Sequence, residues 1–402
     1  MNILYLAHRL PYPPDKGDKI RSFHQIQHLS GHHRLWCACF IDEPADVAHV
    51  AALERYCQAV AAIRINPTFA KMRGLVRLSR GGTLTEGFYD NPRMRNTLQA
   101  WSAGIDFDAV FVFSSGMAPY ARPFRQARRV IDLCDWDSAK WNAYGRRRTP
   151  LAPLYRLEAR RLARREAAWT RSFHAAVVIT QAEADDAPPG ALTDRIHVVC
   201  NGVTKWPYQP PPAQPRVGFL GAMDYPPNID AVCFFARQVW PHITRAAPQA
   251  TFHIGGRNPT ARVRRLGRLP GIEVLGQVPD ANAAINDVAV SVAPLRIARG
   301  LQNKVLEAMA AGRPVVLTTP AAQGIGAKNG REFLVADDPL EMAAQATDLL
   351  THPRQAADMG QAARRFVGQN FDWSHEMAKL DRLLAGSAAP RPAPPPFQAV
   401  TV

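Results

Sequence analysis

The sequence predicts an α/β protein of two doubly wound domains that face each other across a cleft. Short apolar runs alternate with helical stretches along most of the 402 residues, which is the pattern of a parallel sheet covered on both faces. The alternation is interrupted at 205–215 by KWPYQPPPAQP, a run too rich in proline for the interior of a helix or strand. The length also exceeds what one hydrophobic core usually serves.

The first series of elements is expected to form an N-terminal Rossmann-like domain over 1–204. Its predicted strands are 3–7, 34–41, 59–65, 109–113, 130–133 and 175–179, with early helices at 20–29 and 47–56. The Pro-rich segment 205–215 is expected to be a linker. Because strands and helices alternate, the strands of this domain are expected to run parallel.

The second series is expected to form a C-terminal Rossmann-like domain over 216–370. Its predicted strands are 217–220, 251–254, 272–275, 288–292 and 314–317, with helices at 230–240, 303–311 and 339–350. A last helix is predicted within 371–386. Residues 387–402 contain too few apolar side chains to order themselves, so we expect a disordered tail.

Composition excludes a fibre or a wholly disordered chain, since 47% of the residues are hydrophobic and 21% are charged. Lys and Arg number 49 against 34 Asp and Glu, which leaves a net charge of +15. Such an excess favours an anionic partner, which could be a nucleotide, a sugar phosphate, a nucleic acid or an acidic membrane surface. Six scattered cysteines form neither a disulfide framework nor a zinc-type pair.

Targeting signals are not evident in the sequence. The N-terminal MNILYLAHRLPYPP lacks a basic region before its short apolar run, so we expect no signal peptide. No run approaches the ~20 apolar residues of a membrane-spanning helix. We therefore expect a cytoplasmic protein, either soluble or attached peripherally to the inner face of the plasma membrane.

The most informative stretch is VSVAPLRIARGLQNKVLEAMAAGRPVVLT at 290–318. A strand ends at Pro294, a loop with Arg296, Arg299 and Gly300 follows, and a helix carrying Glu307 comes next. Loop N–H groups and the positive end of a helix form a site for an anion such as a diphosphate, and a carboxylate on that helix can accept both hydroxyls of a ribose. Loop-then-helix units with arginines are also common in ordinary α/β connections.

The segment KVLEAMAAGRPVV at 304–316 resembles the nucleotide-sugar signature of retaining glycosyltransferases of family 4. Those enzymes have the GT-B fold of two facing Rossmann-like domains. Their motif carries two acidic residues eight positions apart; Glu307 takes the second place, whereas Arg299 stands at the first. The resemblance implies a nucleotide-diphosphate sugar donor, and we expect Arg299 to contact its phosphate.

The resemblance extends over nearly the whole chain. GFLGAMDYPPNIDAV at 218–232, HIGGRNP at 253–259 and VVCNGV at 198–203 are similar to further family segments. Where many members carry an Arg/Lys pair after the first strand of this domain, this chain does not, so Lys304 and Arg257 are expected to supply the charge. The resemblance implies catalytic roles for Arg299, Lys304 and Glu307. The residues expected to bind the nucleotide sugar are Gly17, Gly221, Asn228, Gly256, Arg257, Gly300, Leu301, Asn303 and Glu307.

Three segments, at 8–23, 131–141 and 299–310, together resemble the sugar transferases associated with exosortase (PEP-CTERM) exopolysaccharide systems. This narrower resemblance implies a role in the synthesis of exopolysaccharide or another cell-surface glycan. The acceptor is then expected to be a saccharide or a lipid-linked saccharide.

The first domain is expected to present the acceptor. The acceptor-side candidates are Lys19, Arg21, Ser114, Ser115, Asp135 and Asp137. Gly17, in the turn after the first strand, lets the backbone approach a ligand closely, although PPDKG is also an ordinary turn. Asp135-Trp136-Asp137 spells a DxD pattern that binds metal in other sugar transferases, but we favour a polar role toward the acceptor and expect no metal.

Two helical segments can each be interpreted in two ways. His24, His28 and His32 share one helical face, which is either a ligand array or, as we favour, a half-exposed structural face. The arginine-rich segment 146–171 carries an apolar stripe interrupted by Glu158. It is either a membrane-surface helix or, as we favour, a core-facing helix with a solvated basic face.

The sequence therefore predicts a glycosyltransferase that needs no cofactor and no metal. Fixed charges and dipoles stabilise a leaving group that is already anionic. Two rivals remain: a nucleotide-sugar epimerase of the same fold, and a non-enzymatic protein that binds membrane or nucleic acid. No nucleic-acid-binding motif is visible, so we expect no nucleic-acid partner.

Overall fold

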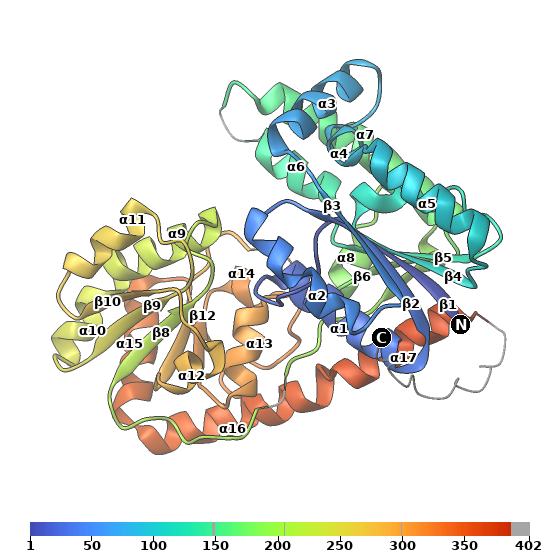
Figure 1. Ribbon diagram of the computed structural model, residues 1–402. Coiled ribbons are helices and arrows are strands. Elements are labelled where there is room, and N and C mark those ends of the chain that lie inside the picture. Colours follow the sequence, from blue (N-terminus) through green and yellow to red (C-terminus); the bar gives the residue numbers. More distant parts are fainter. Residues whose placement is uncertain (147–148, 205, 299, 387–402) are drawn as a thin grey trace. The chain divides into compact units, whose positions relative to one another are not determined.

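The computed structural model describes residues 1–146, 149–204, 206–298 and 300–386. Arg299 and the expected tail at 387–402 lie outside the described residues. The chain divides into two compact units. Unit 1 comprises residues 1–200 together with the chain from Ser374 onward, and unit 2 comprises residues 201–373 (Figure 1).

Unit 1 is built on a sheet of seven parallel strands in the order β3-β2-β1-β4-β5-β6-β7. The strands are β1 Asn2–Ala7, β2 Arg34–Ile41, β3 Ala59–Arg64, β4 Ala109–Phe113, β5 Arg128–Cys134, β6 Ala175–Val178 and β7 Ile196–Val198. The side chains of β1 from Ile3 onward and all those of β4 are buried, as expected for central strands with both faces covered.

The helices of unit 1 follow the strands. They are α1 Gly17–His32, α2 Val50–Glu54, α3 Pro67–Ser79, α4 Leu84–Tyr89, α5 Pro92–Gly104, α6 Asp137–Gly145, α7 Ala152–Ser172, α8 Gln181–Asp185 and α17 Trp373–Ala385, with 3₁₀ turns η1 Pro44–His49, η2 Ser115–Ala121 and η3 Thr193–Arg195. Asn66 and Asn91 cap α3 and α5 through side-chain oxygens, each followed by a proline at the first helical position.

Unit 2 repeats the plan with six parallel strands in the order β10-β9-β8-β11-β12-β13. The strands are β8 Arg216–Leu220, β9 Thr251–Gly255, β10 Ile272–Gly276, β11 Val290–Ala293, β12 Val315–Leu317 and β13 Leu334–Val335. The helices are α9 Pro226–Phe234, α10 Trp240–Ala246, α11 Ala261–Arg264, α12 Ala281–Asn286, α13 Asn303–Ala310, α14 Thr319–Ala322, α15 Pro339–Thr351 and α16 Pro353–Asn370, with a π turn η4 Phe235–Val239 and a 3₁₀ turn η5 Arg265–Arg268. The predicted α/β class with two doubly wound sheets is confirmed.

Both sheets reverse their strand order once, between β1 and β4 in unit 1 and between β8 and β11 in unit 2. Open parallel sheets bind ligands outside the carboxyl ends of the strands at such a reversal. A ligand site is therefore expected among the residues that follow β1, β4, β8 and β11.

The described residues of the segment at 205–215, expected to be a linker, pack on unit 2. Arg364 donates to the carbonyl oxygen of Trp206 at 2.7 Å and lies 5.6 Å from the ring centroid of Tyr208. The buried Arg313 donates to the carbonyl oxygen of Gln209. Proline has no N–H to donate, but every residue of the segment keeps a carbonyl oxygen that can accept a hydrogen bond. The two arginines bind the carbonyl oxygens of Trp206 and Gln209.

The histidine face of α1 is structural, as we favoured. His28 Nε2 lies 2.6 Å from Asp381 Oδ2 on α17, and His33 Nε2 lies 3.7 Å from the other oxygen. Although burial opposes the shift, hydrogen bonds from the two histidines hold the pKa of Asp381 well below its usual range. No group of three or more metal-ligating side chains occurs in the part of the chain that the structure describes.

The basic helix α7 is largely core-facing, which confirms the interpretation that we favoured for 146–171. Leu162 and Trp169 of the expected stripe are buried, whereas Leu151 is half exposed. Glu158, which interrupts the stripe, is fully buried and accepts hydrogen bonds from the backbone of Leu84 and Thr85 at the start of α4. None of the described helices is both long enough and apolar enough to cross a membrane.

Candidate functional site

The carboxyl edge of the unit 2 sheet brings together Gly221, Asn228 and Lys304 from three separate segments. Gly221 follows β8, Asn228 lies in the first turn of α9, and Lys304 lies in the first turn of α13. Lys304 Nζ donates to Asn228 Oδ1 and sits 4.7 Å from the centroid of the Phe219 ring. Asn228 Nδ2 donates to the carbonyl oxygen of Ala222 at 2.9 Å, which fixes the orientation of the amide. The ammonium group is thus held at the strand-order reversal.

Two glycines make this close approach possible. Gly256, just after β9, has a φ of +145°, and a Cβ there would lie 1.7 Å from the carbonyl oxygen of Gly221. A Cβ on Gly221 would lie 2.8 Å from Asn228 Nδ2 and 3.2 Å from Lys304 Nζ. The backbone of the two strand ends is therefore packed directly against itself and against the lysine.

Lys304 and Glu307 lie three residues apart on α13, and burial works against the charge of each. Burial lowers the pKa of Lys304 to about 7, although the Glu307 carboxylate opposes this shift. Burial raises the pKa of Glu307 to about 7, although the Lys304 ammonium opposes that shift. No described residue gives the Glu307 carboxylate a hydrogen bond or ion pair. Two poorly solvated groups of this kind mark a candidate functional site.

The loop before α13 positions the start of the helix. Gly300 adopts the left-handed region with a φ of +62°, and Leu301 is buried beneath the loop. Asn303, the first residue of α13, accepts a hydrogen bond from Asn201 Nδ2 at 3.0 Å. The positive end of α13 and the Lys304 ammonium therefore lie at the same strand edge. Arg299, expected to contact phosphate, lies outside the described residues.

The two other arginines near this site differ in what they contact. Arg257 contributes its carbonyl oxygen to the turn after β8 by accepting from the backbone N–H of Met223 at 2.9 Å. Arg296 donates to both oxygens of Asp230, at 3.0 and 2.6 Å, and stacks 4.9 Å from the centroid of the Phe234 ring. Its charge is thus paired with α9, and we do not assign it to a phosphate.

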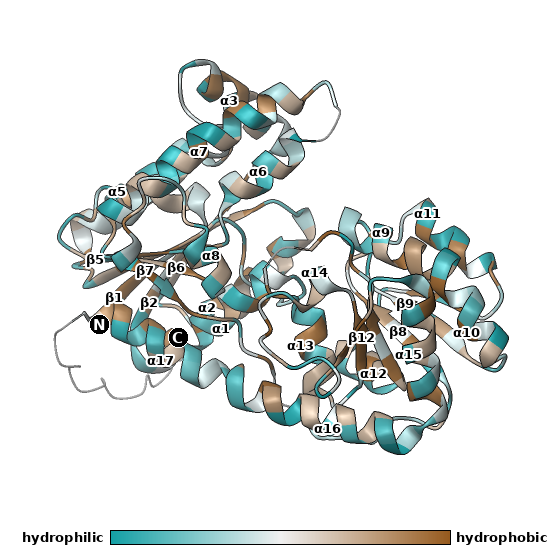
Figure 2. Cartoon of the chain, turned by 180° about the vertical axis from the view of Figure 1, so that it is seen from behind, coloured by the Kyte–Doolittle hydropathy of each residue, from teal (hydrophilic) through white to brown (hydrophobic). Residues whose placement is uncertain are grey.

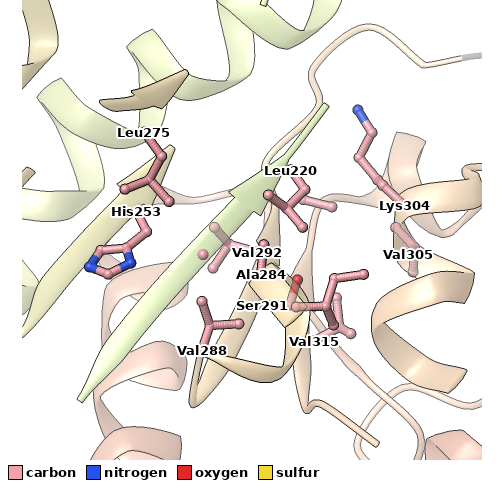
Figure 3. Close-up of a pocket in the computed structure, with 13 residues that line it drawn as sticks. Leu220, His253, Leu275, Ala284, Val288, Ser291, Val292, Lys304, Val305 and Val315 are labelled. Atoms are coloured by element: carbon pink, nitrogen blue, oxygen red, sulfur yellow. The ribbon is translucent and has the colours of Figure 1, made fainter. Parts of the chain in front are cut away.

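A small cavity of about 20 Å³ lies beneath this edge and is lined by the stem of Lys304 together with Gly218, Leu220, His253, Ser291 and Val305, among others. Figure 3 shows the Lys304 amino group directed away from the apolar side chains of this cavity. A space of this volume holds about one water molecule. We therefore interpret the cavity as a packing void under the site, not as the ligand pocket.

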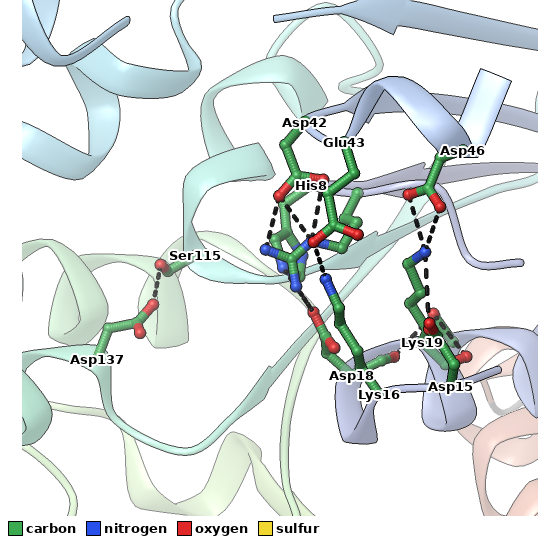
Figure 4. Close-up of polar contacts among 12 residues, drawn as sticks. His8, Asp15, Lys16, Asp18, Lys19, Asp42, Glu43, Asp46, Ser115 and Asp137 are labelled. Carbon is green, nitrogen blue, oxygen red and sulfur yellow. Dashed lines mark hydrogen bonds and ion pairs between the residues drawn. The ribbon is translucent and has the colours of Figure 1, made fainter. Parts of the chain in front are cut away.

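The carboxyl edge of the unit 1 sheet carries part of the expected acceptor-side set. Ser114 and Ser115 follow β4, where Ser114 adopts a strained φ of +81°. Ser115 Oγ donates to Asp137 Oδ2 at 2.5 Å, so these two side chains meet as predicted candidates (Figure 4). Asp137 lies in the first turn of α6, where the positive helix end favours a carboxylate.

Lys19 and Arg21 require a correction, because the structure places both in buried ion pairs. Lys19 Nζ lies 2.8 Å from both oxygens of Asp46, and Arg21 Nε lies 2.8 Å from Asp132 Oδ2. Each of the two cations is about 1% exposed. Their charges already have partners inside the fold, so we remove them from the acceptor-side set. Gly17, expected to approach a ligand, is the first residue of α1.

The sequence analysis missed the cluster of charges that follows β1. Arg9 donates to Asp18 at 2.7 Å and to Asp42 at 3.0 Å, and Lys16 pairs with Glu43 (Figure 4). Although burial opposes the shift, hydrogen bonding and charge from His8, together with the Arg9 charge, hold the pKa of Asp18 well below its usual range. The position of His8 and Arg9 directly after the first strand was the signal available in the sequence.

The DxD segment divides its residues between the edge and the core. Asp135 and Asp137 are partly exposed, whereas Trp136 between them is buried and donates from Nε1 to the carbonyl oxygen of Glu183 at 2.6 Å. Behind it, Ser138 donates through its backbone N–H at 3.1 Å, and through its hydroxyl, to Glu166. Burial raises the pKa of Glu166 to about 8.

A larger cavity, about 670 Å³, lies elsewhere in unit 1 and is lined by α4, α5 and η2 residues, including Tyr89, Arg95, Leu98 and Tyr120. None of the predicted site residues lines it. Two of its three lining arginines are already paired, since Arg95 binds Asp90 and Arg77 lies 3.9 Å from Glu86. We assign it no ligand.

Comparison with known proteins identifies the domain and the fold. Residues 214–352, which lie within unit 2, match the family model described as Glycosyl transferases group 1, so this part of the chain is similar to that family. No curated protein is similar enough in sequence to match. Similar solved structures include Anabaena Alr3699/HepE in complex with UDP and glucose, at 15% identity and a TM-score of 0.66, covering 96% of this chain and 99% of that chain.

Two further structures resemble the whole chain equally well. TarM matches at 12% identity and a TM-score of 0.67, over 96% of this chain and 99% of that chain. Sucrose-phosphate synthase from Thermosynechococcus elongatus matches at 16% identity and a TM-score of 0.65, over 95% of this chain and 98% of that chain. At such identities the likeness establishes the fold alone, which is GT-B, as the sequence resemblance implied.

Proposed function

We propose that the protein is a glycosyltransferase that moves a sugar from a nucleotide-diphosphate donor to a saccharide or lipid-linked hydroxyl. The observation that carries the proposal is the meeting of Lys304, Asn228 and Gly221 at the strand-order reversal of unit 2, with Glu307 three residues after Lys304 on α13. The group 1 glycosyl transferase domain found over the same residues supports it.

The donor is expected to bind with its diphosphate at Lys304 and the start of α13. An ammonium ion, backbone N–H groups and the positive helix end all favour an anion there. Glu307, which lacks a partner among the described residues, is expected to accept the ribose hydroxyls. Because HepE has been solved with UDP-glucose, a UDP-sugar is the first donor to test.

Transfer breaks the bond between the anomeric carbon and the diphosphate oxygen and forms a bond to the acceptor oxygen. The nucleoside diphosphate leaves with the bonding electrons, and the acceptor hydroxyl gives up its proton to an oxygen of the departing diphosphate. Lys304 and the α13 dipole are expected to stabilise the charge that develops on the leaving group, and electrostatic stabilisation of this kind is usually the largest single contribution to catalysis. Retention of configuration, and a role in exopolysaccharide synthesis, belong to this proposal through the sequence resemblance alone.

Unit 1 is expected to present the acceptor. The pair Ser115 and Asp137, at the carboxyl edge of its sheet, can bind sugar hydroxyls as donor and acceptor of hydrogen bonds. We propose no nucleic-acid partner, because we assign the excess of positive charge to a nucleotide ligand and to an anionic surface.

Replacing Glu307 by Gln tests the donor assignment. Loss of a charged hydrogen bond to ribose is expected to weaken nucleoside diphosphate binding about 10- to 100-fold, measured by titration calorimetry with a panel of bases. The fold should survive. Burial raises the pKa of Glu307 from 4.5 to about 7, so stability from this group is present below pH 4.5 and is lost as the pH rises to about 7.

The Gln variant is therefore expected to be at least as stable as the native chain above pH 7. An unchanged affinity for every nucleoside diphosphate would refute the assignment. Turnover of a donor sugar without any acceptor would instead indicate an epimerase.

The proposed reaction uses no metal ion, because Lys304 and the helix end act on the leaving group. We expect sugar transfer to persist after treatment with a chelator and dialysis. Transfer that is abolished by the chelator and restored by a divalent cation would contradict this, and would direct attention back to Asp135 and Asp137.

A further inference from the structure

Helix α3 exposes an apolar face that the sequence analysis did not single out. Phe69, Met72, Leu75 and Val76 are 63, 58, 51 and 49% exposed. At 3.6 residues per turn these four side chains fall within an arc of about 120°. Large apolar side chains gathered on one helix face mark an interaction surface, whereas single exposed ones do not.

The opposite side of the same helix holds it in place. Ala70, Gly74 and Leu78 are buried, and the backbone of Leu84 on α4 approaches Gly74 so closely that a Cβ there would meet the Leu84 carbonyl oxygen at 3.0 Å. Arg161 of α7 donates to the carbonyl oxygens of Leu78 and Gly82. The exposed face is therefore presented by a packed helix and does not belong to a frayed segment.

Basic residues border this apolar face on both sides. Lys71 lies on one flank, and Arg73, Arg77 and Arg80 lie on the other, in a segment from 67 to 85 that contains no Asp or Glu. Arg73 and Arg77 contact α4, through the carbonyl oxygen of Phe88 and through Glu86. Lys71 and Arg80 are exposed and have no ion-pair partner among the described residues.

The position of α3 leaves this face accessible. Helices α3, α4, α6 and α7 form a group that projects beyond the sheet of unit 1, with α3 at its outer end (Figure 1). In the hydropathy view, α3 shows apolar turns between hydrophilic ones at the tip of that group (Figure 2). Leu151, at the start of α7, is also half exposed.

We propose that α3 is a membrane-docking helix that inserts Phe69, Met72, Leu75 and Val76 among the acyl chains of an anionic bilayer. Lys71 and Arg80 would contact the phosphate headgroups. An apolar face bordered by cations is the pattern of a helix lying in the membrane interface, and anionic lipids attract such cations when they lie within a Debye length. The proposal concerns binding to lipid and does not require sugar transfer.

Flotation with lipid vesicles, in the absence of donor and acceptor, tests the proposal. The full chain is expected to float with vesicles of phosphatidylglycerol and phosphatidylcholine, and far less with phosphatidylcholine alone. The double substitution Phe69→Ser and Met72→Ser is expected to weaken partition at least tenfold. The matched control is Leu340→Ser with Leu269→Ser, which removes exposed apolar side chains from unit 2 and should leave partition unchanged.

The charge contribution has its own variant. Lys71→Glu with Arg80→Glu should weaken partition by about fivefold or more per side chain, and added salt should reduce this difference. Arg262→Glu with Arg268→Glu makes the same charge change on exposed positions of unit 2 and should have a clearly smaller effect.

Hydrogen exchange supplies a readout at the site itself. Amides of 67–80 should exchange more slowly when anionic vesicles are added, while thermal melts should show that the exposed-face variants fold normally. The proposal is overturned if the native chain does not float, if the α3 variants float as well as their controls, or if light scattering shows an α3-dependent dimer, which would mean that a second copy covers this face.

Discussion

Lys304 combines a low pKa with a fixed position, and this combination has a measurable consequence at the scale of a single residue. Burial lowers its pKa from 10.5 to about 7, so near neutral pH the side chain is about half protonated. A diphosphate favours the charged form. The Lys304 side chain should therefore take up protons on binding near pH 7, and affinity should fall as the pH rises above 7. Because the pKa of Glu307 is also about 7, this dependence is measured with Glu307→Gln in place, so that only Lys304 titrates.

Replacing Lys304 by Met tests this dependence. The variant is expected to bind nucleoside diphosphates about 10- to 100-fold more weakly and to lose the fall in affinity above pH 7. Calorimetry in buffers of different ionisation enthalpy measures both the affinity and the proton uptake. Lys328→Met, at an exposed position of unit 2, is the matched control. Proton uptake that persists in the Lys304 variant would contradict the assignment.

Single residues also show which features of the candidate site could be predicted from the sequence. Glu307 was predicted from its place in a motif, because a carboxylate at that helical position has one recognisable use. The partnership of Lys304 with Asn228, 76 positions away, could not be predicted, since nothing local specifies which loop lies opposite. The buried ion pairs of Lys19 and Arg21 could not be predicted, because a cation near the start of a helix has the same sequence signature whether or not a distant carboxylate pairs with it.

At the scale of elements, the turns after β8 and β9 depend on each other. Gly256→Ala would place a Cβ 1.7 Å from the Gly221 carbonyl oxygen, at a φ of +145°. The overlap and the backbone strain together are expected to cost more than about 3 kcal/mol of unfolding free energy. Chemical denaturation measures this loss.

Gly276→Ala is the control for backbone strain alone. Its φ is +70°, and no atom lies within 4 Å of the added Cβ. We expect a loss of about 1 kcal/mol. If the two variants were equally stable, the close approach of the turns would not be what Gly256 provides.

Helix α3 illustrates a limit of pattern reasoning at the same scale. The buried face of α3 consists of two small residues, Ala70 and Gly74, and one large apolar residue, Leu78. The other large apolar residues of the helix face outward. A periodicity analysis counts apolar residues without knowing which face has a partner. The membrane alternative was therefore attached to α7, where Leu162 and Trp169 of the stripe proved to be buried.

For the molecule as a whole, the chain returns to unit 1 after forming unit 2, and helix α17 packs there. Met377, Leu380 and Leu384 of α17 are buried, and Asp381 joins His28 and His33 of unit 1. Truncation after Trp373 is expected to destabilise the protein by about 5 kcal/mol or more, from apolar burial alone. The thermal midpoint is the measurement.

Truncation after Gly386 is the matched control and should leave the midpoint unchanged, because the removed composition is poor in apolar residues. The prediction fails if both truncations behave alike. The sequence analysis predicted the helix but treated it as a separate C-terminal element, since hydrophobic periodicity reports that a helix has a buried face and not which unit buries it.

The amino-acid sequence alone determined the class of fold, the series of strands and helices in each half, and the helix that carries Glu307. These depend on local periodicity, turn chemistry and short motifs, which act over a few residues. Only the tertiary structure decided which charges are paired inside unit 1, that the proline segment packs on unit 2, and which helix faces remain uncovered. Such outcomes depend on contacts between residues tens to hundreds of positions apart, and no local pattern encodes them.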